Sequence, residues 1–335
     1  MKGFDTRWTD LPDFIIGITK EIWEDRGVAT LTHRYGAQIP VRSPASVVVG
    51  NQGVIAATMA TLAEFPDRTL LGEDVIWSGD PDSGKGMLSS HRLISTATHS
   101  APGVYGAPTG KRLRYRIIAD CHAIDDHIDD EWLVRDQGAI VRQLGIEPRD
   151  FARDLIFREG GPERCVRPLT PDTDVPGPYK GRGNDNEWGA RLADTLGRIM
   201  RADFTAIPQV YDRAANLHYP GGQDGLSHGD ADRFWMGLRA AFPSAEFTIH
   251  HVIGRDDPGM PPRAAVRWSL WGRHEGWGAF GTPTRAQVYV LGMTHAEFGP
   301  WGGVDGRHGW GLRREWTLYD ETAIWKQILL QTGDL

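Results

Sequence analysis

The chain has 335 residues, 40% hydrophobic and 24% charged, which is typical of a soluble globular protein with about two domains. Its formal net charge of -7, with no run of Lys and Arg, argues against nucleic acid as a partner, because binding a phosphate backbone needs a basic face. The two cysteines exclude a disulfide framework, and the short amphipathic N-terminal stretch is neither a signal peptide nor a membrane span, so we expect a cytoplasmic location and no membrane partner.

The first half of the chain predicts helices followed by strands. Ile15, Ile18 and Ile22 share one face of an amphipathic helix, and Gly27 is a stop signal for it. A second helix is expected over residues 53–64, where Phe65-Pro66 ends it, because proline cannot continue a helix. Strand-like runs bounded by Gly, Pro and Asp clusters follow at residues 70–79, 87–99, 112–124 and 131–136.

The second half predicts the same order of elements. Leu192, Leu196 and Ile199 mark the first helix, and residues 230–241 form the second, which ends at a Phe-Pro. The expected strands are residues 246–254, 264–274, 286–298 and 314–320. Between the halves, residues 158–186 are rich in Pro, Gly and Asp, which predicts an irregular linker that is long enough to lie across a pocket.

Ordered matches between the two halves indicate a duplication. The matched anchors are Phe65-Pro66 with Phe242-Pro243, Pro108-Thr109 with Pro283-Thr284, Glu131-Trp132 with Glu315-Trp316, Asp136 with Asp320, and Gln143 with Gln327. We therefore predict a first domain at residues 10–150, a linker at 151–187 and a second domain at 188–332. Helices followed by antiparallel strands favour an α+β fold, with N-terminal helices packed on a curved, mostly antiparallel sheet.

The segments "AEFPD", "WSGD", "YGAPTGK", "EW…D" and "QLG" occur in the order seen in SnoaL-like polyketide cyclases, which the chain resembles in two tandem copies. That family belongs to the nuclear-transport-factor-2-like superfamily. The resemblance implies cone-shaped domains with a deep pocket between the helices and the concave sheet face. Such pockets host isomerase, hydrolase and cyclase chemistry as well as plain binding. The superfamily commonly dimerises through its sheets, which implies an internal pseudo-dimer of the two domains and a possible homodimer.

An aldol-type cyclisation needs a base beside a carbonyl and an acid for the developing alkoxide, and neither requires a metal or other cofactor. Strand alternation places Asp120 and His122 on one face of residues 112–124, amid apolar neighbours. His295 falls at the corresponding position of the second copy, with Glu297 two residues later on the same face. We predict Asp120, His295 and Glu297 as acid/base residues; the alternatives are a solvent-facing surface for Asp120 and a satisfied, partly buried imidazole for His295.

Several further residues are candidates for the pocket. His99 precedes the Gly- and Pro-rich turn, and the resemblance implies that it acts at the pocket mouth, while the turn residues themselves are explained by backbone geometry. No metal site is predicted, because the spacing of His122 and His127 in "DCHAIDDHIDDE" fits no tetrahedral pattern and favours an Asp-rich hairpin turn, as "GGVDGRHGWG" does in the second copy. The predicted substrate-binding residues are Trp77, His122, Trp132, Trp268 and Trp316.

The resemblance also implies an Asp directly after the later Trp, but Leu133 and Thr317 stand there. The repeated Asp136 and Asp320 lie three residues further on, where they can equally cap or anchor the final strand. The leading hypothesis is a cofactor-independent enzyme that acts on a small or medium carbonyl-containing molecule in an apolar pocket. The alternative is a protein of the same fold that only binds a small molecule or serves in assembly.

Overall fold

The computed structural model describes residues 1–300 and 309–335. They form two α+β units, one for each half of the sequence, and each unit contains a six-stranded mixed sheet. The strand order is β2-β1-β6-β5-β4-β3 in the first sheet and β8-β7-β12-β11-β10-β9 in the second. The two orders are identical when each strand is paired with its counterpart. The predicted fold class and the duplication are therefore confirmed.

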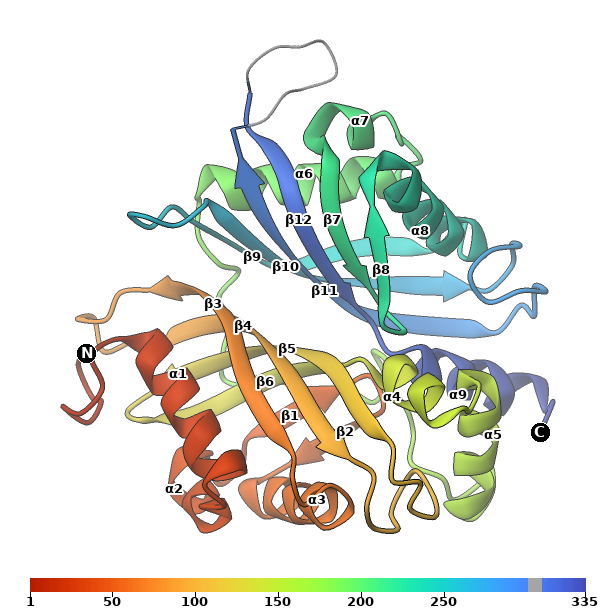
Figure 1. The fold of residues 1–335 in the computed structure, drawn as a ribbon, viewed down its shortest axis with the longest axis horizontal. Coiled ribbons are helices and arrows are strands. Elements are labelled where there is room, and N and C mark those ends of the chain that lie inside the picture. Colours follow the sequence, from red (N-terminus) through yellow and green to blue (C-terminus); the bar gives the residue numbers. More distant parts are fainter. Residues whose placement is uncertain (301–308) are drawn as a thin grey trace.

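The first unit contains α1 (Leu11–Thr19), a π-helical turn (Lys20–Glu24), a 3-10 turn (Val28–Thr30), α2 (Leu31–Arg34), β1 (Pro40–Ser43), β2 (Ser46–Val49), α3 (Asn51–Glu64), β3 (Thr69–Gly79), β4 (Met87–Thr98), β5 (Arg112–Ile124), β6 (His127–Arg135), α4 (Gln137–Leu144) and α5 (Pro148–Arg158). The helices α1 to α3 lie on the outer face of its sheet (Figure 1).

The second unit repeats this plan with α6 (Glu187–Met200), α7 (Ala206–Val210), β7 (Tyr211–Tyr219), β8 (Gln223–Leu226), α8 (Ser227–Ala241), β9 (Glu246–Arg255), β10 (Arg263–Arg273), β11 (Gln287–Gly299), β12 (Gly311–Leu318) and α9 (Glu321–Thr332). Sequence analysis missed the short hairpins β1–β2 and β7–β8. Each hairpin adds a parallel neighbour to the last strand of its sheet, β1 to β6 and β7 to β12, while the other pairings are antiparallel.

The repeated Asp residues are helix caps. The Asp136 carboxylate accepts a hydrogen bond of 2.9 Å from the Ala139 N–H at the start of α4, and Asp320 accepts one of 2.8 Å from the Thr322 N–H at the start of α9. An N-cap carboxylate satisfies amide groups that lack a partner within the helix. The recurrence of these two Asp residues is thus explained by structure, and the segment after them is helical.

The repeated Gln residues have the same kind of explanation. The Gln143 side chain accepts from the Arg114 N–H and donates to the Arg114 carbonyl, both at 2.9 Å. Gln327 makes the matching pair of bonds to Tyr289, at 2.7 and 2.9 Å. Each Gln therefore continues the hydrogen-bond ladder along the edge of a strand. It attaches its own helix, α4 or α9, to the sheet.

The two sheets face each other in the middle of the molecule, with helices on the outside (Figure 1). The contacts between them obey an approximate twofold relation. Arg92 of β4 lies 3.5 Å from the centre of the Trp316 ring, and its counterpart Arg267 of β10 lies 3.5 Å from the centre of the Trp132 ring. Such cation–π contacts are worth most when both groups are desolvated. This face of each sheet is therefore a buried, polar interface between the domains.

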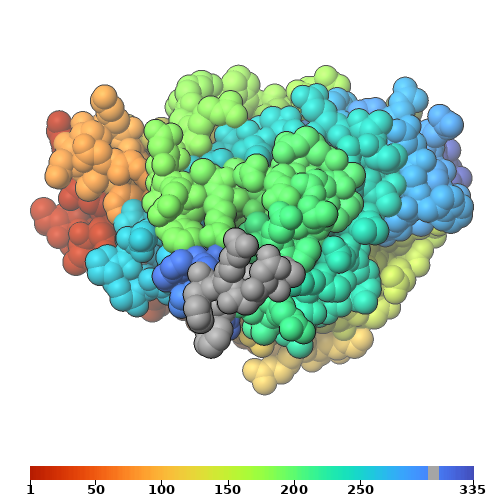
Figure 2. All heavy atoms as spheres, turned by 90° about the horizontal axis from the view of Figure 1, so that it is seen from above, coloured from red at the N-terminus to blue at the C-terminus, as the bar shows by residue number. Residues whose placement is uncertain are grey.

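Residues 159–186 connect α5 to α6 and contain no helix or strand in the described structure. They are ordered against the domain interface: the Tyr179 ring lies 4.7 Å from the His122 ring, and the Tyr179 hydroxyl is 2.7 Å from His251 Nε2. Seen from above, this pale green segment lies directly against the second domain, while red and orange residues of the first domain emerge at one edge (Figure 2).

No helix of the described residues is long and apolar enough to cross a membrane. The hairpin turn expected at "GGVDGRHGWG" falls largely on residues 301–308, which lie outside the described residues.

Candidate functional site

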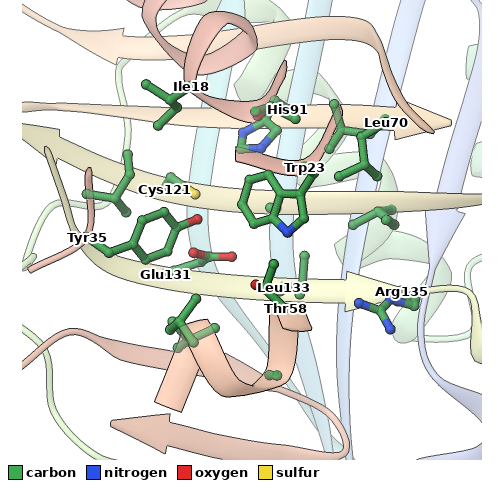
Figure 3. Close-up of a pocket in the computed structure, with 18 of the residues that line it drawn as sticks. Ile18, Trp23, Tyr35, Thr58, Leu70, His91, Cys121, Glu131, Leu133 and Arg135 are labelled. Carbon is green, nitrogen blue, oxygen red and sulfur yellow. The ribbon is translucent and has the colours of Figure 1, made fainter. Parts of the chain in front are cut away.

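A pocket of about 140 Å³ lies between the helices and the concave sheet face of the first domain (Figure 3). A cavity of about 150 Å³ is sufficient to bind benzene, so this one has room for a small organic molecule. Its apolar walls come from α1, α3 and all strands of the sheet: Ile15, Ile18, Val41, Val48, Val54, Leu70, Leu93, Ile117, Ala119, Ile128 and Leu133. The site is thus concave and mostly apolar, as small-molecule sites are.

Strand register arranges the pocket floor in three rows across β4, β5 and β6. The first row ends in Glu131, opposite Cys121, and the third ends in Arg135, opposite Ile117. The middle row runs from His91 through Ala119 to Leu133. Because alternate residues of a strand share a face, these side chains all point toward the helices. The floor therefore carries an acidic group at one end, an imidazole in the middle and a guanidinium at the other end.

Glu131 is the carboxyl group of this pocket. Its side chain is buried, and burial raises its pKa to about 7, although hydrogen bonding from the Tyr35 hydroxyl acts in the opposite direction. Oε2 of Glu131 is buried and has no hydrogen-bond partner among the described residues. Figure 3 shows the carboxyl group beside the Tyr35 hydroxyl and facing the cavity. A carboxyl group with a pKa near neutrality can accept and return a proton at physiological pH.

His91 is the imidazole of the middle row. Burial lowers its pKa to about 4, so the ring is neutral at pH 7. Nδ1 lies 3.1 Å from the Ser89 hydroxyl, which fixes the orientation of the ring. When Ser89 donates to Nδ1, and not to the Cys121 carbonyl oxygen 3.4 Å away, the proton of the neutral ring is on Nε2. In that tautomer Nε2 is a hydrogen-bond donor for an oxygen atom in the pocket.

The mouth of the pocket lies between α3 and the π-helical turn. Ala57 of α3 lines the pocket and is exposed to solvent, and Trp23 is half-buried on the π-helical turn. A π-helical turn inserted after an α-helix is often associated with function, because it redirects side chains that a regular helix would place elsewhere. Here it carries Trp23 over the cavity (Figure 3).

The second domain has large aromatic side chains in the corresponding space. Trp235 takes the place of Thr58 and Trp268 that of Leu93, and both tryptophans are fully buried. Room for the Trp268 ring is made by Gly292, whose Cα faces the indole. The interior of this domain is therefore packed as a core.

The Glu that matches Glu131 is fully bonded in the second domain. Glu315 Oε2 accepts from the hydroxyls of Tyr211 at 2.7 Å and Tyr219 at 3.1 Å, and Oε1 accepts from the Thr317 hydroxyl at 2.6 Å. By strand register, Ser43 and Leu133 stand in the first domain where Tyr219 and Thr317 stand in the second. The Ser43 hydroxyl donates to the Ser46 carbonyl and Leu133 has no hydroxyl, so these two donors to Glu315 have no counterpart at Glu131.

The structure places Asp120 and His295 together, but in the domain interface and away from the pocket. Asp120 Oδ2 lies 3.1 Å from Arg267, and the whole side chain is buried. His295 Nε2 lies 2.8 Å from the Ser90 hydroxyl and Nδ1 lies 3.2 Å from Arg92. The predicted alternation along β5 is observed, yet the side chains of the opposite face, including Cys121, line the pocket. Both faces of β5 are buried, so alternation alone did not distinguish them.

The other predicted site residues also lie outside the pocket. Glu297 pairs with Arg314 at 3.1 Å near the surface. His99 is buried at a chain corner, with Nδ1 3.2 Å from the Thr109 hydroxyl, and the matching His274 makes the same contact to Thr284 at 3.1 Å. Trp77, Trp132 and Trp316 contact arginines, His122 pairs with Asp129, and Trp268 is a core residue. Their proposed roles in catalysis or substrate binding stay predictions.

Sequence analysis did not select Tyr35, His91, Glu131 or Arg135. Glu131 belongs to the repeated Glu-Trp pair, in which the Trp and the following Asp are the more conspicuous residues. A usable signal was present, because Glu131, Leu133 and Arg135 alternate on one face of β6. Among the described residues there is no group of three or more His, Cys, Asp or Glu side chains that could hold a metal ion.

No protein-family model matches this chain, and no curated protein matches it. Solved structures do match single domains of it. IdmH from Streptomyces antibioticus is 21% identical over 40% of this chain and 98% of its own, with a TM-score of 0.35. TsrD from Streptomyces laurentii is 18% identical over 40% and 94%, with a TM-score of 0.35. A SnoaL-like polyketide cyclase from Agrobacterium tumefaciens is 19% identical over 41% and 99%, with a TM-score of 0.33. Each of these structures matches this chain over about the length of one copy, and one of them is named a SnoaL-like polyketide cyclase.

Proposed function

We propose that the first domain is an acid/base enzyme for a small or medium apolar molecule that contains a carbonyl group. In this proposal Glu131 removes a proton from the carbon next to the carbonyl and returns it at the same or another position. This reaction class includes isomerisation and ring closure. The side chains of the pocket supply the groups that it needs, so a cofactor is not part of the proposal.

The roles follow from the surroundings of each group. Glu131 takes the proton, and the apolar walls raise its pKa enough for it to be an effective base. The neutral His91 ring donates from Nε2 to the carbonyl oxygen and stabilises the enolate as charge develops there. Tyr35 orients the carboxyl group through its hydroxyl. Trp23 and α3 limit the access of water, which strengthens each of these polar interactions.

One observation carries the proposal. Glu131 Oε2 is buried in an apolar cavity and has no partner within residues 1–300 and 309–335, whereas the same oxygen of Glu315 is bonded by two tyrosine hydroxyls. Leaving a buried acceptor unpaired costs about 1–3 kcal/mol, so such a group is more often found where a ligand completes it.

The test is proton exchange on a simple ketone. We expect the protein to accelerate the exchange of the α-protons of 2-tetralone in D2O, followed by NMR, with a rate that rises with pH through about 7 as Glu131 ionises. Glu131→Gln should slow the exchange by about 10²–10⁴-fold, which is the usual contribution of a general base. The matched control is Glu315→Gln, where Gln keeps the shape and an acceptor for the tyrosine hydroxyls. Exchange no faster than in buffer, or equal in wild type and Glu131→Gln, would contradict the proposal.

For the second domain, a different function is favoured by its filled interior. Trp235 and Trp268 occupy the space that a ligand would take, while Arg267 reaches across to the first domain. We infer that the second domain acts in assembly: it covers the sheet of the first domain and holds it in shape. This matches the binding-or-assembly alternative for one domain and the enzyme hypothesis for the other.

A further inference from the structure

Two guanidinium groups lie at the end of the pocket that is far from Glu131. Arg68, which precedes β3, is only 4% exposed and lines the pocket. Arg135 lines it at the end of β6, and its Nε is buried without a hydrogen-bond partner in the described part of the chain. Both arginines act on Tyr115: burial raises the pKa of Tyr115, but the charges of Arg68 and Arg135, with hydrogen bonds from Ser95 and Arg68, outweigh burial, so that the pKa lies below its ordinary value.

These two arginines lack a carboxylate partner among the described residues. Arg135 is half-buried, and the arginines that are as buried as Arg68 each have a carboxylate partner: Arg42 pairs with Asp130, Arg92 with Glu73, Arg263 with Asp74 and Arg267 with Asp120. Arg68 has a hydroxyl instead, with Nε 3.4 Å from the Ser95 oxygen. Burial lowers the pKa of Arg68, and the positive charge of Arg135 acts in the same direction. A buried cation without a counter-ion is unfavourable unless a ligand supplies the opposite charge.

The spacing of the two ends limits the shape of such a ligand. Glu131 and Arg135 are four residues apart on one strand, so their Cα atoms are separated by about 13 Å. Apolar side chains line the space between them, including Leu133 and Ile117. A ligand that reaches both ends therefore has an apolar middle that separates its two polar ends.

We infer that the ligand of this pocket is an amphiphilic keto acid, whose carboxylate pairs with Arg68 and Arg135 while its carbonyl end lies at Glu131 and His91. A carboxylate matches a guanidinium in shape and charge and carries a single negative charge into an apolar site. The position of the carbonyl rests on the proposed function, whereas the position of the carboxylate rests on the arginines alone.

The test uses 7-oxooctanoate and its methyl ester, which share one ketone and differ in charge. Titration calorimetry with the full chain should give at least about tenfold tighter binding of the acid, because a charge-assisted hydrogen bond contributes about 1.5–3 kcal/mol. Arg135→Met should reduce this preference, because the carboxylate then pairs with Arg68 alone, and it should weaken binding of the acid more than binding of the ester. Arg114→Met is the matched control, because Arg114 is exposed and does not line the pocket. Equal affinity for acid and ester, including no detectable binding of either, would overturn the inference.

Exchange of the protons beside the ketone separates this inference from the proposed function. Binding that prefers the acid and depends on Arg135, without exchange that depends on Glu131, would leave the inference standing and contradict the proposed function. Exchange that depends on Glu131 but is equally fast for acid and ester, with equal affinities, would support the proposed function and contradict the inference. Thermal unfolding of each variant identifies any loss of affinity that comes from a failure to fold.

Discussion

The two domains share a sheet topology and a Tyr–Glu pair, yet the first domain has a cavity inside it and the second has a packed core. In the first domain Tyr35 neighbours Glu131 at the wall of a cavity. In the second, Tyr211 donates to Glu315 inside a packed aromatic core. Burial raises the pKa of both Glu residues, but Glu315 is also bonded by Tyr219 and Thr317. The comparison indicates that the shared pair is part of the fold and that its availability depends on the residues around it.

A few substitutions account for the difference in interior volume. Thr58 and Leu93 are replaced by Trp235 and Trp268, and each Trp adds a large buried apolar surface. Gly292 is the complementary change, because a side chain there would collide with the Trp268 ring. The second domain therefore gains core packing where the first keeps a cavity, which is a cost in stability that a binding site requires.

The largest expected effect comes from making the first domain resemble the second. Thr58→Trp places the side chain of Trp235 at the matching point of α3, where Thr58 lines the pocket. We expect loss of ketone binding and of measurable proton exchange, because the indole occupies the cavity. Stability should change by at most about 1–3 kcal/mol, as is usual for an overpacked site. Retained exchange in a folded Thr58→Trp variant would place the chemistry outside this pocket.

The reverse change in the second domain should affect stability instead. Trp235→Thr removes a fully buried indole from a packed core. We expect a loss of about 3–5 kcal/mol in the free energy of unfolding, measured by urea denaturation, because a cavity remains. Exchange by the fraction that is still folded should equal that of wild type. A loss below about 1 kcal/mol would show that this interior is not a close-packed core.

The pH dependence of stability gives the next test. Glu131 has its pKa raised from 4.5 to about 7 in the folded chain, so between these values the folded state holds a proton that the unfolded state has released. The free energy of unfolding therefore decreases as pH rises through this interval, by about 3 kcal/mol in total from this group. Glu131→Gln removes this contribution. The difference in stability between Glu131→Gln and wild type should accordingly grow from pH 4 to pH 8; a constant difference would mean that Glu131 is not buried as an acid.

The architecture could be predicted from the sequence because a feature that occurs in both copies is supported twice. The sequence predicts the ends of α3 and α8 closely, because Phe65 and Phe242 are repeated. It also predicts β5 and β11 closely, because their apolar segments are repeated. The hairpins β1–β2 and β7–β8 were missed, because strands as short as the four residues of β1 give too little alternation to recognise.

The site was harder to predict, for a physical reason. Alternation along β5 separates Asp120 from Cys121, but it does not say which face meets the helices and which meets the other sheet. Both faces are buried, so both carry apolar residues, and polar residues occur on each. Asp120 was predicted as a catalytic residue because it is a carboxylate among apolar neighbours. Its partner Arg267 lies 147 positions further along the chain, and no local sequence pattern connects the two.

The smallest expected effect distinguishes the interface from the pocket most directly. His295→Gln removes an imidazole that contacts Ser90 and Arg92 across the domains, and burial keeps the pKa of this imidazole well below its ordinary value, so it is neutral. We expect stability to fall by about 1–3 kcal/mol, the cost of leaving buried partners unpaired. Exchange of 2-tetralone should be unchanged, because His295 does not line the pocket. A large loss of exchange at unaltered stability would instead support the sequence-based assignment of His295 to catalysis. The second domain, and not the first, would then supply a residue for the reaction.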